Sequence, residues 1–89
     1  MHEMGVANSI LEAVEQELDR YPGKRAVKIA VRIGEFAGVD PESLRFCFEA
    51  LVKGTEREPL ELAIDWRTAS EDLDLAYLEL EEENTEAPV

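Results

Sequence analysis

The sequence predicts a small α+β domain in which a mixed three-stranded β-sheet packs against two α-helices on one face, in the order α-β-α-β-β. Three observations support this prediction. Two segments carry apolar residues at helical spacing, three others alternate apolar and polar residues, and the second helical segment lies between the first two strands. A helix between two strands makes a crossover, which favours a parallel pair, whereas a short loop before the third strand favours antiparallel pairing.

Composition limits the size of this domain and the partners that it can bind. With 89 residues, 45% of them hydrophobic, the chain can build one small core, and we expect a single domain over residues 1–80. A formal net charge of −12 argues against nucleic acid and anionic membrane surfaces as partners, because both require a basic face. Neither a signal peptide nor an apolar run long enough to span a membrane is visible, so we expect a cytoplasmic protein.

The first helix is predicted over residues 3–21, and Pro22 and Gly23 end it. Glu3 falls in the first turn, where the helix dipole stabilises an anion, which is a structural reason for a carboxylate there. The apolar stripe repeats at spacings of three and four and consists of Met4, Ala7, Ile10, Leu11, Val14 and Leu18.

The first strand is predicted over residues 24–36, where apolar and polar residues alternate. One phase of the alternation is expected to face the core and consists of Val27, Ile29, Val31 and Ile33.

The second helix is predicted over residues 41–53. Asp40 is a good N-cap, Pro41 suits the first helical position, and Gly54 follows the helix end. Cys47 lies on the apolar stripe of this helix and is expected to be a small core residue. We expect no enzymatic activity, because no second histidine could activate this thiol and no acid/base set is visible.

Two further strands, over residues 60–67 and 73–80, complete the sheet. Alternation slips within the last strand, and a β-bulge near Ala76 would bring its four leucines to one face. Residues 81–89 are acidic and turn-rich and predict a disordered tail. One sheet face would stay exposed, and edge strands that can pair with a second chain make a homodimer one expected assembly.

The first residues of the chain indicate a metal site. His2 is the only histidine, and it follows the α-amino group of Met1 directly. That amine, the amide nitrogen of residue 2 and the imidazole can close fused chelate rings around one ion, and Glu3 can add a fourth contact through its carboxylate or its backbone nitrogen. Such donor sets suit Ni(II) or Cu(II) rather than zinc. The alternative is that a histidine at position 2 has no function.

These motifs together resemble the HypA/HybF family of nickel-incorporation proteins for hydrogenases. The resemblance covers nearly all of residues 1–67. It rests on the opening Met1-His2-Glu3-Met4, on Ser-Ile-Leu-Glu at residues 9–12, on Arg-Ile-Gly-Glu at 32–35, on Gly-Val-Asp-Pro-Glu-Ser-Leu at 38–44 and on residues 46–55.

The resemblance implies a nickel metallochaperone that works with a HypB-like GTPase and delivers Ni(II) to the large subunit of a [NiFe] hydrogenase. By the same resemblance Met1, His2 and Glu3 would carry nickel, and Asp40 would support the site.

One feature of the family is absent from the sequence. Its members normally carry a zinc domain with two CxxC motifs before the last strand, whereas this chain has a short polar loop there and Cys47 as its only cysteine. We therefore expect no structural zinc. The alternative function is a metal-free interaction protein that uses the same scaffold to dock on a hydrogenase subunit or another maturation factor.

Overall fold

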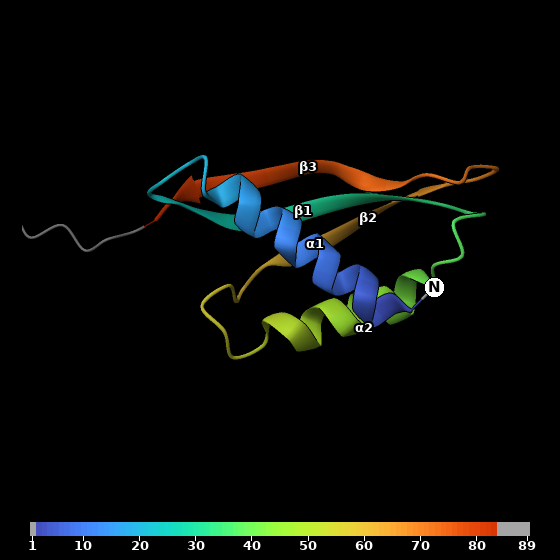
Figure 1. Cartoon of the computed structure of the whole chain (residues 1–89), viewed down its shortest axis with the longest axis horizontal. Helices are drawn as coiled ribbons and strands as arrows, with labels where there is room; N and C mark the ends of the chain where they lie inside the picture. The colour runs from blue at the N-terminus through green and yellow to red at the C-terminus, as the bar shows by residue number, and fades with distance from the viewer. Residues whose placement is uncertain (1, 84–89) are drawn as a thin grey trace, which may run out of the picture.

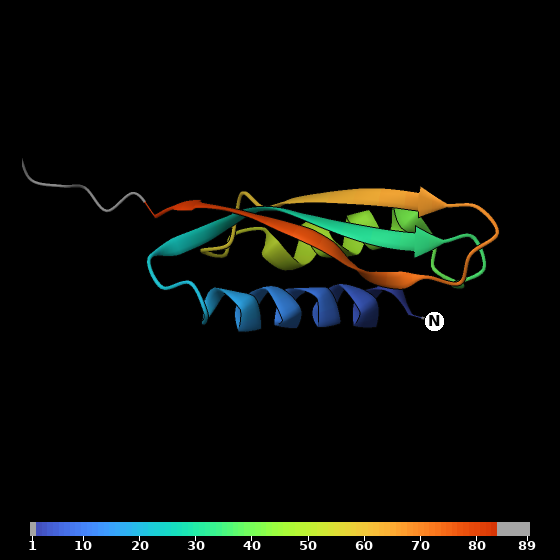
Figure 2. The same ribbon diagram turned by 90° about the horizontal axis from the view of Figure 1, so that it is seen from above.

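A computed structural model describes residues 2–83, which form two helices and one three-stranded sheet (Figure 1). Both helices pack on the same face of the sheet (Figures 1 and 2), which confirms the predicted α+β class and element order. The elements are α1 (Glu3–Leu18), β1 (Lys24–Gly34), α2 (Pro41–Val52), β2 (Glu61–Arg67) and β3 (Leu73–Glu82). Neither helix combines the length and the apolar composition that would let it cross a bilayer, a finding that applies to the described residues.

β1 is the central strand of the sheet, whose order is β2-β1-β3. It pairs with β2 in parallel, as the crossover through α2 predicted, and with β3 in antiparallel orientation. The central position of β1 agrees with its burial on both faces. Ile29 and Ile33 are fully buried on the helix side, and Ala30 is only 3% exposed on the other side. The two strands that flank it are therefore the edges of the sheet.

β1 and β3 each contain one β-bulge. In β3 the extra residue is Ala76, between Leu75 paired with Val31 and Tyr77 paired with Ala30, so the predicted bulge is confirmed. In β1 the extra residue is Val27. This second bulge shifts the phase of the strand, so the prediction that Val27 faces the core is wrong. Ala26, 3% exposed, takes the core position instead.

β3 extends two residues beyond the predicted end of the domain at residue 80. Glu81 pairs with Arg25 and Glu82 with Lys24, and the Lys24 ammonium lies 2.8 Å from the Glu82 carboxylate. The prediction of a disordered tail from residue 81 is therefore wrong for Glu81 and Glu82, because opposite charges across two strands favour pairing there. Residues 84–89 of that predicted tail lie outside the described residues.

The core lies between the sheet and the two helices. Cys47 is half-buried and packs against this core, as its place on the apolar stripe predicted. The fully buried large side chains are Val14 of α1, Leu44 and Phe48 of α2, and Ile29 and Ile33 of β1.

The loop between β2 and β3 folds against the end of β1. The backbone N–H groups of Gly34, Glu35 and Phe36 donate to carbonyls of residues 72, 67 and 70, at 2.7, 2.8 and 2.7 Å. The Glu35 carboxylate in turn accepts from the N–H of Ala69 (2.9 Å). These bonds give the backbone polar groups of the loop hydrogen-bond partners and hold the loop against the end of β1.

Gly34→Ala should destabilise the fold by about 2 to 3 kcal/mol, because a Cβ at this position would lie 2.2 Å from the Ser70 carbonyl oxygen. Urea unfolding followed by circular dichroism measures this change. Gly5→Ala is the control: its Cβ would meet nothing within 4 Å, and alanine in α1 should stabilise the fold by roughly 0.5 to 1 kcal/mol. Equal midpoints for the two variants would contradict the expected clash.

Candidate metal site at the amino terminus

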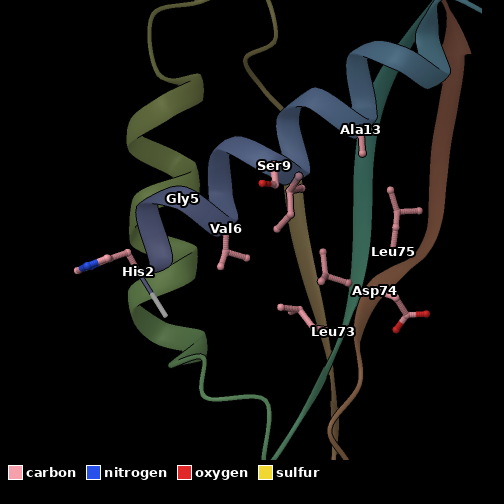
Figure 3. A pocket seen from close by; sticks show the side chains of 10 residues that line it. His2, Gly5, Val6, Ser9, Ala13, Leu73, Asp74 and Leu75 are labelled. Carbon is pink, nitrogen blue, oxygen red and sulfur yellow. The ribbon is translucent and has the colours of Figure 1, made fainter.

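His2 is the N-cap residue of α1. Its backbone is extended (φ −82°, ψ 121°), and its carbonyl accepts the first helical hydrogen bond, from Val6 N–H at 3.1 Å. The imidazole is exposed and points away from the space between α1 and β3 (Figure 3). Among the described residues the side chain makes no capping hydrogen bond to α1. The imidazole is therefore available to a ligand.

The backbone nitrogens next to this imidazole lie at the start of the helix. The first four N–H groups of an α-helix have no acceptor within the helix, and the nitrogens of His2 and Glu3 precede the first helical donor, Val6. A metal ion could bind these nitrogens without removing a hydrogen bond from α1. Further along the helix, the same binding would break one.

The Glu3 side chain connects α1 to the start of α2. Its Oε2 accepts from the backbone N–H of Asp40 at 3.0 Å. This hydrogen bond, with a smaller contribution from the N–H of Glu3 itself, lowers the pKa of the Glu3 carboxyl below its usual value. Oε2 of this carboxylate is thus hydrogen-bonded to the residue that caps the neighbouring helix.

Asp40 is the N-cap of α2, as predicted. Its Oδ1 accepts from Glu42 N–H at 3.0 Å, and its Oδ2 accepts from the Ser43 hydroxyl at 3.2 Å. The structure thus brings Glu3 and Asp40 together, but through the backbone of Asp40. Within the described part of the chain, no hydrogen bond joins Asp40 to His2.

A hollow beside the amino terminus contains residues that the sequence did not assign to the site. His2, Glu3 and Met4 line one side, and α2 contributes the rest, including Cys47 and Phe46, which is 73% exposed. In the sequence, Phe46 flanks the apolar stripe of its helix, and this position was the signal that could have assigned it to the hollow. Residues 2–83 contain no group of three or more His, Cys, Asp or Glu side chains close enough to hold a metal.

Comparison with known proteins identifies the family. Residues 1–84 match the model of the family described as hydrogenase/urease nickel incorporation, metallochaperone, hypA. The chain belongs to the HypA family. Hydrogenase maturation factors HypA from Geobacter sulfurreducens and Chlorobium limicola are 42% and 45% identical to it over 65 residues, 73% of this chain and 56% of each relative. The factor from Methanopyrus kandleri is 42% identical over 65 residues, 73% of this chain and 46% of that protein.

The chain spans about half the length of the curated relatives that it matches. The match to the family model confirms the family resemblance inferred from the sequence.

The hydrogen bond between Glu3 and Asp40 should weaken as pH falls. Because the folded state lowers the pKa of Glu3, its stabilising contribution is present above the carboxyl's ordinary pKa and is lost as pH falls through the folded value. The amide resonance of Asp40, followed by ¹H–¹⁵N NMR, should titrate with a midpoint below 4.5, the usual value. Glu3→Gln is the control and should remove the part of this titration that comes from Glu3; an Asp40 amide titration identical in the variant would contradict the contact.

Asp40→Ala should lower the free energy of unfolding by about 1 kcal/mol, because it removes the cap of α2. Asp40→Asn retains an oxygen at the capping position and should change stability by only a few tenths. Chemical denaturation of both variants tests this. A loss of the same size in both would show that the charge of Asp40, rather than its capping oxygen, stabilises the helix.

Proposed function

We propose that this protein is a nickel carrier that binds one Ni(II) at its amino terminus and gives it up to a hydrogenase during maturation. The donors would be the α-amino group of Met1, a residue outside the described range, the backbone nitrogens of His2 and Glu3, and the His2 imidazole. The observation that carries this proposal is the position of His2, exposed at the N-cap of α1 beside amides that the helix does not use.

The chemistry of these donors favours Ni(II) or Cu(II). Nitrogen donors in a tetragonal arrangement suit these two ions, and the family match supports nickel between them. The positive end of the helix dipole disfavours a cation at this position. Backbone nitrogens that bind without their protons each bring a negative charge, which compensates for that effect and makes binding weaker as pH falls.

Glu3 would contribute its backbone nitrogen, and its carboxylate would hold the amino terminus in place. Since Oε2 accepts from Asp40 N–H, nickel bound through that same oxygen would compete with the hydrogen bond. Asp40 would then support the site by positioning Glu3 rather than by touching the ion. The finding that the Asp40 side chain is already bound to Glu42 and Ser43 supports this division of roles.

Release to a partner requires donors that can be replaced one at a time. The His2 imidazole is exposed, and all the proposed donors come from one end of the chain, so a recipient could substitute its own ligands stepwise. By family membership the partners would be a HypB-like GTPase and the large subunit of a [NiFe] hydrogenase.

Calorimetric titration with Ni(II) tests this function directly. Protein with the native Met1 terminus should bind one equivalent, and His2→Ala should lose at least about tenfold in affinity, because a chelating imidazole is removed. Adding one residue before Met1 should weaken binding similarly, because it displaces the α-amine. Cys47→Ser is the matched control, since Cys47 lines the same hollow, and its affinity should not change.

The same titration decides between the two functions. Binding lost in Cys47→Ser but kept in His2→Ala would overturn the proposed donors. The alternative is a metal-free docking module. An absence of nickel binding in the native protein would support that alternative.

A further inference from the structure

A long apolar groove separates α1 from β3. Its first part has a volume of about 460 Å³ and is lined by side chains that include Val6, Ile10 and Ala13 of α1 and Leu73 and Leu75 of β3. Leu73 lies on the side of β3 that faces Val6, whereas the carboxylate of Asp74 turns away (Figure 3).

The groove continues along both elements. A second part of about 410 Å³ shares Ala13 and Leu75 with the first and reaches Leu78 and Leu80, with the polar side chains of Gln16 and Glu17 on its α1 side. All four leucines of β3 therefore line one groove. The bulge at Ala76 makes this possible, because it returns Leu73 and Leu75 to the face that Leu78 and Leu80 occupy.

The outer edge of β3 borders this groove and pairs with no other strand within residues 2–83. At the opposite edge of the sheet, Arg45 of α2 donates to the carbonyl of Leu62 in β2 (2.5 Å) and occupies a backbone acceptor of that strand. Within residues 2–83, no side chain hydrogen-bonds to the backbone of β3. The backbone groups along the outer edge of β3 are therefore available for pairing.

The two helices are placed differently relative to the sheet. In Figure 2 α2 passes behind the sheet, whereas α1 lies beyond β3, outside the outline of the sheet. Figure 1 shows that α1 nevertheless lies on the helix-covered side. A fourth strand added beside β3 would lie over α1, and its inward side chains would fill the groove.

The charge of β3 identifies the kind of strand that fits. The strand carries four acidic residues and no basic one: Asp74, Glu79, Glu81 and Glu82. Each lies within 4.0 Å of a basic side chain of β1, yet all four acidic side chains stay more than half exposed, so they can still meet a further basic group. Antiparallel pairing with a second copy would place these carboxylates near their counterparts, on two chains of formal charge −12 each. Like charges on neighbouring strands repel, so a basic strand is favoured over a second copy.

We propose that the groove binds an extended segment of another protein that alternates apolar and basic side chains and adds to β3 as a fourth strand. Its backbone pairs with the free edge, its apolar side chains enter the leucine-lined groove, and its basic side chains meet the acidic residues of β3. This binding needs no nickel, so its test is independent of the metal site.

A metal-free binding experiment tests the proposal with a blocked peptide of alternating leucine and lysine, as long as β3. Leu75→Thr should weaken peptide binding about tenfold, since the leucine is 37% exposed and would become buried. Tyr77→Thr is the matched control: Tyr77 is on the same strand, 47% exposed, and pairs with Ala30 on the face away from the helices. Its affinity should not change, and equal urea midpoints for both variants show that the fold is intact.

Hydrogen exchange adds a second measurement. Bound peptide should slow the exchange of amides in β3 and leave those of β2 unchanged. The proposal is overturned if the peptide does not bind, if both variants weaken it equally, or if an alternating leucine–glutamate peptide binds as tightly. A concentration-dependent dimer of the native chain that Leu75→Thr abolishes would also overturn it, because the occupant would then be a second copy.

Discussion

The hydrogen bond from Asp40 N–H to the Glu3 carboxylate connects the starts of the two helices, and the geometry of the amino terminus depends on it. The carboxylate lies at the positive end of α1, and Asp40 caps α2 through its own side chain. One contact therefore satisfies a backbone donor at the start of α2 and fixes where α1 begins. His2 precedes Glu3 directly, so the exposed position of the imidazole follows from the same contact.

This arrangement explains how so short a segment could hold a metal ion. A site built from side chains needs several elements to bring its ligands together, whereas backbone nitrogens beside His2 are already adjacent along the chain. Most backbone nitrogens in a fold are committed to secondary structure. The start of α1 is one of the few places where they are not, and there the helix supplies a rigid base without competing for the donors.

Local patterns predicted most of the fold, and contacts between distant segments decided the rest. Spacing and capping residues predicted both helices, the cap at Asp40 and the bulge at Ala76. The bulge at Val27 was not predictable, because the alternation of β1 is regular in sequence and the shift appears only in its pairing with β3. In the sequence alone, Glu81 and Glu82 look like part of an acidic tail. Only the long-range pairing with β1 places Lys24 and Arg25 opposite them.

α1 serves both proposed sites, which has a consequence for the order of events. His2 lines the end of the groove as well as the hollow beside α2, so a segment bound along β3 would have one end next to the proposed nickel donors. Burial in the groove would orient the partner before any donor is replaced, and the exchange of ligands would then take place within one complex. The acidic edge of β3 would select the partner by charge, while the nitrogen donors at His2 would determine the metal.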